Sequence, residues 1–132
     1  EFYEVDVCSL DEFVLRHDIR QMDVLKIDTE GNDPLVILGA IKSLAFLRPA
    51  YLQFENHSVG RWATFNLKDI IDLLDGLSYE CFWATEANNL IRINSCWSES
   101  YAKYKHWSNI ACYDRRSYDL KVRMDKYILQ MP

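Results

Sequence analysis

Residues 23–34 read DVLKIDTEGNDP, and the interpretation of the whole chain starts from them. The apolar, partly β-branched run bounded by two aspartates predicts a buried strand over residues 23–28. Gly31 supplies a sharp turn, and Asp33 and Pro34 are a favoured N-cap and first residue of a helix. The stretch therefore predicts a strand, a tight turn and a helix over residues 35–46.

The alternation of strand and helix continues on both sides of this stretch. Ser9 and Glu12 have the spacing of a capping box at the start of a helix, and Asn66 is a favoured cap for the clearest helix in the chain. Alternating strands and helices predict an α/β fold with a mostly parallel, doubly wound sheet. The further strands are expected over residues 4–8, 50–55, 79–84, 90–93 and 107–113, and the further helices over 9–17, 67–76 and 98–105.

Composition limits the partners that the chain can have. With 132 residues, of which 49% are hydrophobic, the chain has enough apolar material for the core of one domain. Its net charge is −5 and its longest basic run is Arg115-Arg116, so neither a nucleic acid nor an anionic membrane is expected to bind. No apolar run approaches the roughly 20 residues of a membrane span. The start of the chain does not resemble a targeting peptide.

The four cysteines are far apart and form no C-x-x-C pair, so a zinc site is not expected. Cys8, Cys81 and Cys112 lie in apolar, strand-like contexts, where a thiol is usually a small buried hydrophobe. The four could pair with one another, but the pattern favours free thiols in a reducing compartment, and a cytoplasmic location is expected.

Two predicted strands each end in a carboxylate, Asp28 and Glu55. In parallel neighbours these acids emerge at one edge of the sheet, roughly 5 Å apart at the backbone. Two carboxylates that close require a cation, a shared proton or a hydrogen-bond donor between them. Glu30 adds a third acid and Asn56 a neutral oxygen. Asp28, Glu55 and Asn56 thus form a candidate site for magnesium or calcium.

Simpler roles for these residues stay open. Unpaired helix amides could stabilise Glu30, and Glu55 could pair with Lys26 or Arg61. His57 follows the second acidic strand end and is a candidate general base, although a lone loop histidine is more often solvated. Three tryptophans are interpreted as core or cover rather than as pocket walls: Trp62, Trp97 and Trp107.

Residues 23–33, continuing to Leu38-Gly39-Ala40, resemble the FkbM family of S-adenosylmethionine-dependent methyltransferases. The pattern of that family is a hydrophobic strand, Lys-Ile-Asp, a small residue, Glu-Gly, and a helix that ends near Gly-Ala. Ser9-Leu10-Asp11 is similar to its usual Thr-Leu-Asp. Residues 50–55 resemble its next strand, which also ends in Glu, and residues 107–112 resemble the closing strand of one branch of the family.

The resemblance implies transfer of a methyl group from S-adenosylmethionine to a hydroxyl or carboxyl oxygen of a small-molecule acceptor. Asp28 and Glu30 would lie beside the reacting centre and, with Gly31, contact the cofactor; Asp28, Glu30 and His57 are the candidate catalytic residues. Asp28 with Glu55 and Asn56 also resembles the metal site of catechol-type O-methyltransferases.

The resemblance further implies a half-sheet with the strands in the order 23–28, 50–55, 107–113 and 79–84, the third running antiparallel between its neighbours. Residues 1–115 would be the C-terminal part of the methyltransferase domain, and residues 116–132 a tail.

One departure concerns the cofactor. The family holds it on a glycine-rich turn after its first strand, whereas none of the four glycines here forms a G-x-G after a strand. We therefore expect a chain that lacks the cofactor-binding half and binds S-adenosylmethionine too weakly to measure. Its first strand would have an unpaired edge, which allows self-association, for example as a homodimer. Two other functions stay open: a non-catalytic interaction module that retains a methyltransferase half-sheet, and a metal-dependent hydrolase that uses the strand-end carboxylates.

Overall fold

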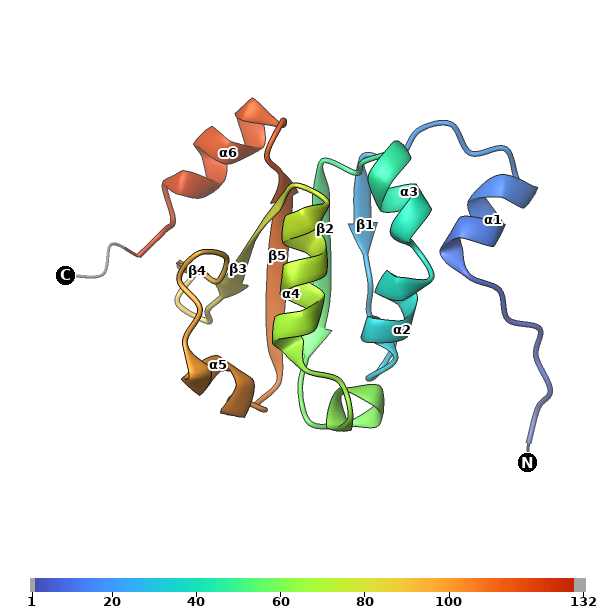
Figure 1. Cartoon of the computed structure of the whole chain (residues 1–132), viewed down its shortest axis with the longest axis horizontal. Helices are drawn as coiled ribbons and strands as arrows, with labels where there is room; N and C mark the ends of the chain where they lie inside the picture. The colour runs from blue at the N-terminus through green and yellow to red at the C-terminus, as the bar shows by residue number, and fades with distance from the viewer. Residues whose placement is uncertain (1, 130–132) are drawn as a thin grey trace.

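The computed structural model describes residues 2–129 and shows an α/β fold built on one five-stranded sheet (Figure 1). The strands are β1 (Val24–Lys26), β2 (Tyr51–Asn56), β3 (Tyr79–Ala84), β4 (Leu90–Arg92) and β5 (Ser108–Asp114). The helices are α1 (Leu10–Arg16), α2 (Asp33–Leu38), α3 (Ile41–Phe46), α4 (Leu67–Gly76), α5 (Glu99–Lys103) and α6 (Tyr118–Asp125), with a 3₁₀ turn, η1 (Gly60–Ala63).

The strands lie in the order β1-β2-β5-β3-β4, which confirms the predicted order and adds β4 at the far edge. The prediction of a mostly parallel sheet is wrong. Only β1 and β2 pair in parallel among the strands described, whereas β5 is antiparallel to both its neighbours and β4 is antiparallel to β3. The reason is the insertion of β5: it separates β2 from β3, which would otherwise have formed a second parallel pair.

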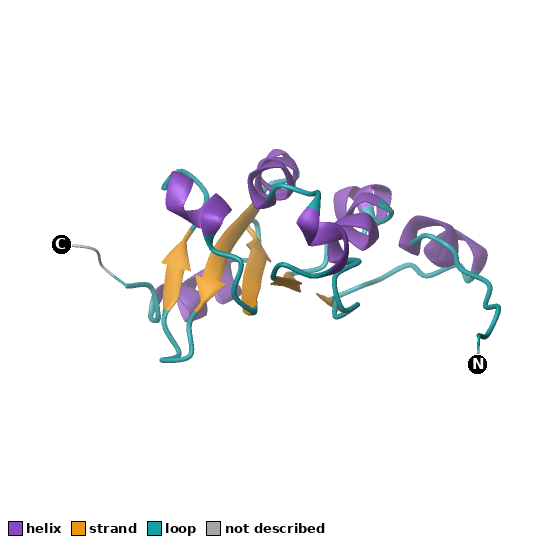
Figure 2. Ribbon diagram, turned by 90° about the horizontal axis from the view of Figure 1, so that it is seen from below, coloured by secondary structure: helices purple, strands orange, loops and turns teal. Residues whose placement is uncertain are grey.

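Helices cover the two faces of the sheet unequally (Figure 2). The helices α2 to α5 lie on one side, and α6 lies on the other, beneath β3 and β5. Residues along β2 accordingly alternate between partly exposed and buried, with Leu52, Phe54 and Asn56 turned toward the helices. The opposite face of β1 and β2 stays open to solvent.

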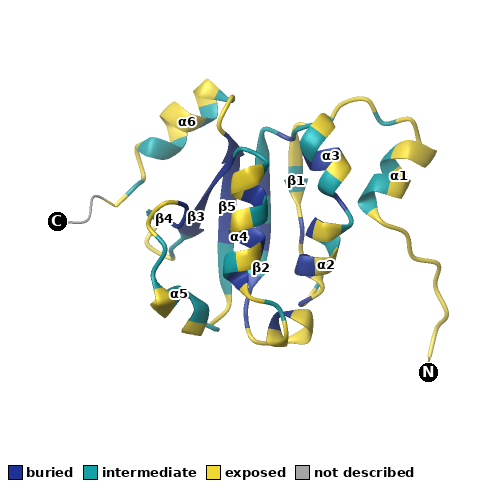
Figure 3. Ribbon diagram, in the orientation of Figure 1, coloured by how far each residue is buried: buried dark blue, intermediate teal, exposed yellow. Residues whose placement is uncertain are grey.

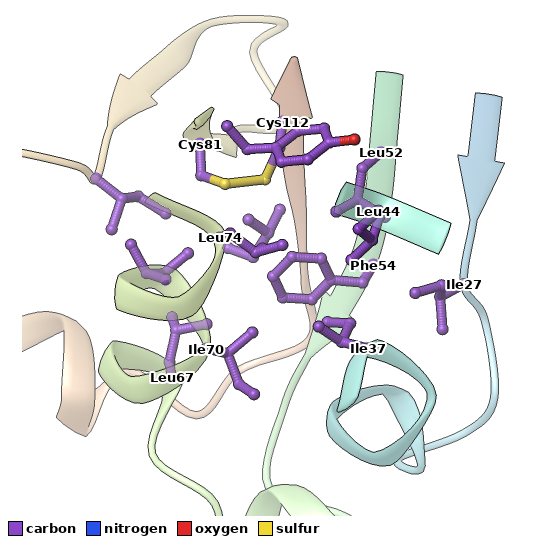
Figure 4. Close-up of a cluster of buried hydrophobic side chains, with 14 of the residues drawn as sticks. Ile27, Ile37, Leu44, Leu52, Phe54, Leu67, Ile70, Leu74, Cys81 and Cys112 are labelled. Atoms are coloured by element: carbon purple, nitrogen blue, oxygen red, sulfur yellow. A yellow bond between two sulfur atoms is a disulfide. The ribbon is translucent and has the colours of Figure 1, made fainter. Parts of the chain in front are cut away.

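The core fills the space between the sheet and α2, α3 and α4 (Figure 4). Leu67, Ile70 and Leu74 project from one side of α4, at the helical spacing that the sequence predicts. Trp62 is fully buried in the same core, as expected. The other labelled side chains of this core come from the sheet, the loop after β1 and the first helices: Ile27, Ile37, Leu44, Leu52, Phe54, Cys81 and Cys112.

The edge strand β1 is much less covered than the centre of the sheet (Figure 3). Val24 is 61% exposed, and within the described residues β1 pairs with β2 alone. The predicted unpaired edge is therefore present; self-association through it stays a prediction.

Two local predictions are wrong for reasons of tertiary structure. Residues 4–8 form no strand, since no neighbouring strand in the described part of the chain offers them hydrogen-bond partners. The single helix expected over residues 35–46 is divided into α2 and α3 at Gly39. The main chain of Gly39 lies against α1, so that a Cβ built on it would come within 3.1 Å of the Ser9 Cβ.

Cys81 and Cys112 face each other on β3 and β5 and are joined by a disulfide, which corrects the expectation of free thiols. Their predicted burial is confirmed, because both are fully inaccessible. The predicted burial of Cys8 is wrong, because Cys8 is exposed. Cys96 is exposed as well. The expected strand order already placed the two strands side by side, but the pairing also depends on the register that sets Cys81 opposite Cys112, and strand order does not give that register.

No helix within residues 2–129 has the length and apolar character needed to cross a membrane.

Asp11 joins α1 to α3. Its carboxylate accepts hydrogen bonds from the main-chain N–H of Ser43 at 2.7 Å, the Ser43 hydroxyl at 2.7 Å and the N–H of Lys42 at 3.0 Å. A residue distant in sequence thus caps the N-terminus of α3. Ser9 caps α1 by accepting from the Glu12 N–H, whereas the Glu12 side chain pairs with Arg16 instead of completing the box.

Replacing Asp11 by alanine is expected to lower the free energy of unfolding by about 1–2 kcal/mol at neutral pH, the usual cost of a lost cap. Burial raises the pKa of Asp11, but the hydrogen bonds from Ser43 and Lys42 outweigh it and hold this pKa below its ordinary 3.8. The contribution is therefore complete above pH 3.8 and is lost as the pH falls through the lower folded-state pKa. Urea unfolding at neutral pH and at about pH 3 should show the wild-type advantage shrinking in acid. Asp6→Ala, which changes an exposed acid, is the control, and an Asp11→Ala chain as stable as wild type at neutral pH would contradict the capping role.

Candidate functional site

The carboxyl ends of β1 and β2 form a cluster of charges on the open face of the sheet. The Lys26 Nζ donates to the Asp28 Oδ2 at 2.9 Å. The pKa of Lys26 is raised, chiefly by this hydrogen bond and the charge of Asp28, and further by the charge of Glu55. An ammonium group from the chain itself therefore pairs with Asp28 and offsets one of the two negative charges, while Glu55 adds to its stabilisation through its charge alone.

Trp107 completes this cluster from the loop before β5. Its indole N–H donates to the Glu55 Oε2 at 2.9 Å, and its ring stacks on the imidazole of His57, with centroids 4.1 Å apart. Trp107 is 55% exposed, so the expectation that it belongs to the core is wrong. The residue instead ties the end of β2 to the start of β5 at the surface.

His57 is buried, with only 1% of its surface exposed. Its Nδ1 accepts the N–H of Val59 at 3.1 Å, which places the proton of the neutral ring on Nε2. That Nε2 is buried and has no hydrogen-bond partner among the described residues. In this arrangement His57 presents a donor rather than a base, and its predicted role as general base stays a prediction.

The structure does not gather the predicted metal ligands. Glu55 and Asn56 are neighbours on a strand, so their side chains lie on opposite faces, with Glu55 on the open face and Asn56 buried. The Asn56 amide donates to the Tyr104 carbonyl at 3.3 Å, while its Oδ1 finds no partner in the part of the chain that the structure describes. Within residues 2–129 no three His, Cys, Asp or Glu side chains lie together as metal ligands would. Magnesium or calcium at Asp28, Glu55 and Asn56 therefore stays a prediction.

The loop after β1 holds Glu30 and Gly31 in left-handed backbone conformations, with φ of 51° and 100°. Gly31 packs directly against Gly60, and its carbonyl accepts the Arg61 N–H at 2.8 Å. Its own N–H donates to the Asp33 Oδ2 at 3.3 Å. Both polar groups of Gly31 are thus used within the protein, so the structure gives it a role in the turn. Its contact with the cofactor stays a prediction. Glu30 is exposed beside it.

Asp33 has a different role in the structure from the one that the sequence predicts. We expected it to act as the cap of the following helix, but Asn32 occupies that position. The Asp33 carboxylate is fully buried and accepts from the Thr29 hydroxyl at 3.1 Å and the Glu55 N–H at 3.3 Å, in addition to Gly31. It therefore ties the loop after β1 to β2 and fixes the spacing between the two acidic strand ends.

Sequence reasoning identified Asp28, Glu55 and His57 and weighed Lys26 as a partner of Glu55, but it missed the pairing of Lys26 with Asp28 and the role of Trp107. Lys26 was visible, because residues two apart on a strand share a face and Lys26 precedes Asp28 by two. Trp107 could not be assigned from local pattern, since its contacts come from β2, about 50 residues earlier in the sequence.

Residues 1–81 match the family model described as the methyltransferase FkbM domain. No curated protein and no solved structure matches the chain significantly. The matched region includes β1, the Glu30–Gly31 turn and β2, which carry most of the cluster described above. Because the match spans more than half of the chain, the protein belongs to the FkbM methyltransferase domain family.

Proposed function

We propose that the chain provides the acceptor side of an O-methyltransferase that uses S-adenosylmethionine, with the reacting centre at the carboxyl ends of β1 and β2. The observation that carries the proposal is the juxtaposition of Lys26, Asp28, Glu55 and Trp107 in a member of a methyltransferase family. Ligands of open α/β sheets bind just beyond such strand ends.

The acidic residues at the end of β1 fit the end of the cofactor that carries the methyl group. When bound, S-adenosylmethionine supplies an electrophilic methyl group on a positively charged sulfur. Asp28 and Glu30 carry exposed negative charge that suits this cation. A glycine-rich turn after a strand, which would hold the rest of the cofactor, does not occur in the sequence. We infer that the binding energy for the nucleoside comes from groups other than these residues.

The acceptor hydroxyl must lose its proton as its oxygen gains the methyl group. We assign Asp28 as the group that accepts this proton, because Lys26 hydrogen-bonds to Oδ2 and holds the carboxylate at the strand end. The buried Nε2–H of His57 lies behind Trp107 and is suited to hold an oxygen rather than to remove a proton.

The activity test uses the protein encoded by the complete transcript that contains this chain. Asp28→Asn, which keeps the shape but removes the charge, is expected to lower kcat for methylation of an alcohol by about a hundredfold, the usual contribution of a general base. Asp23→Asn, at the other end of the same strand, is the matched control and should keep full activity. A fully active Asp28→Asn enzyme would show that the base lies elsewhere.

Calorimetry of the 132-residue chain with S-adenosylmethionine tests whether these residues contact only the methyl end of the cofactor. The dissociation constant is expected to be weaker than about 1 mM, because a few contacts at the methyl end do not offset the lost freedom of the ligand. Micromolar binding would show that the whole cofactor site lies within this chain.

A further inference from the structure

A pocket of about 780 Å³ lies beside the cluster, at the carboxyl end of β3 and the start of β5. Four aromatic residues form much of its wall: Trp83, Tyr101, Tyr104 and Trp107. The Trp83 ring lies 5.6 Å from that of Tyr101 and meets that of Tyr104 edge-on at 5.3 Å. The volume suits a small organic ligand, and walls of this kind favour the flat face of a ring.

The pocket adjoins the proposed reacting centre through two residues. Trp107 lines the pocket and also hydrogen-bonds to Glu55 and stacks on His57. Tyr104 lines the pocket and accepts the amide of Asn56 through its carbonyl. A ring bound among the aromatic side chains would therefore have one edge near the acidic strand ends.

The charge of the pocket restricts what can bind. Of the twelve residues that line it, Glu86 is the one that is charged, and none is lysine, arginine or histidine. Glu55, bonded to Trp107, adds a second carboxylate nearby. The neighbouring Lys105 is directed away, since its Nζ donates to the Trp62 carbonyl at 3.2 Å. A ligand with its own carboxylate would meet repulsion, and none of the twelve lining residues offers a cation to compensate it.

We propose that this pocket binds the methyl acceptor and that the acceptor is an uncharged, ring-bearing alcohol or phenol rather than a carboxylic acid. The inference rests on the proposed function, because it names the substrate class of the same site. The family resemblance implies either a hydroxyl or a carboxyl oxygen as the acceptor, and the proposal keeps only the hydroxyl.

Binding is measured with the ¹⁵N-labelled 132-residue chain, without cofactor, from the indole N–H resonances of Trp83 and Trp107. The ligands are 4-hydroxybenzyl alcohol, 4-hydroxybenzoate and propane-1,3-diol at neutral pH. We expect the aromatic alcohol to shift both resonances saturably and to bind about tenfold more tightly than the benzoate. The diol, which has no ring, should shift neither resonance.

Glu86 is exposed on the turn after β3 and can be changed without disturbing the core. Glu86→Gln should narrow the preference for the alcohol over the benzoate to about threefold, since one of the two nearby negative charges is gone. Asp6→Asn, an equal charge change at an exposed acid of the N-terminal segment outside the pocket lining, should leave the tenfold preference intact.

Equal or tighter binding of the benzoate, or unshifted indole resonances with the alcohol, would overturn the assignment. These measurements are independent of methyl transfer. An alcohol that binds here but is not methylated by the complete protein would count against the proposed function and leave the pocket assignment standing. Methylation of an alcohol without binding at Trp83 and Trp107 would do the reverse.

Discussion

Gly31→Ala is expected to lower the free energy of unfolding by about 3 kcal/mol, because two costs coincide at this position. With φ at 100°, Gly31 lies in a region that residues with a Cβ rarely adopt. A Cβ added there would also lie 2.6 Å from the Val59 carbonyl oxygen, which is main chain and cannot rotate away. The loop that carries Val59 and Gly60 would have to move.

The same substitution should disturb the candidate site. The N–H of Val59 holds the imidazole of His57, so a shift of this loop releases the ring that stacks on Trp107. Urea unfolding measures the loss of stability, and the indole resonance of Trp107 reports the local change. Gly76→Ala is the matched control: apart from its chain neighbours and the nearby backbone of its own helix, no atom of the described residues lies within 4 Å of the added Cβ. Alanine in a helix should add about 0.5–1 kcal/mol. Equal effects of the two substitutions would contradict the close approach of Gly31 and Gly60.

Much of the fold could be predicted because its signals are local. The strand at residues 79–84 and the helix at 67–76 were predicted with their observed bounds, and the Asn66 side chain accepts the Lys68 N–H as a cap should. These elements depend on the spacing of apolar residues and on one polar side chain at the end. The order of the four main strands came from the family resemblance and is also confirmed.

The predictions that failed depend on partners distant in sequence. Apolar alternation over residues 4–8 is compatible with a strand, but a strand also requires a neighbour. The break at Gly39 depends on the approach of α1. The antiparallel majority comes from the two pairs that β5 makes, which the expected strand order already implied, and from the pairing of β4 with β3, which it did not include. Each of these is set by tertiary packing, which overrides local preference.

The site was predictable to the same extent. The rule that ligands bind beyond strand ends located Asp28, Glu55 and His57. The strand period also determines that Glu55 and Asn56 face opposite ways, so the proposed metal ligand set conflicted with a rule already available from the sequence. The aromatic pocket was not predictable, since its wall also needs Tyr101 and Tyr104, which α5 brings to the end of the sheet, and the order of the strands does not place that helix.

Removing the disulfide by Cys81→Ala together with Cys112→Ala is expected to cost about 3–4 kcal/mol, a large part of the stability of a domain of this size. The two cysteines are 31 residues apart, and a bond that closes a loop of this length removes many conformations from the unfolded chain. Either single substitution should cost nearly as much, because one missing sulfur already opens the loop. Cys8→Ala with Cys96→Ala is the control, and both of these residues are exposed and unpaired.

Thiol titration decides whether the bond is present before its energy is measured. The chain unfolded without reductant should react at two cysteines, and at all four after reduction. Four reactive thiols without reductant would contradict the pairing. With the bond intact, reductant should reach it only slowly in the folded protein, because both residues are buried beneath α4. Two residues of the pocket lining, Ala84 and Asn109, face each other on the same two strands, three positions from the disulfide. Reduction of the disulfide should therefore also weaken binding of 4-hydroxybenzyl alcohol. A disulfide that stabilises the chain but leaves the pocket unchanged would show that the β3–β5 pairing holds without it.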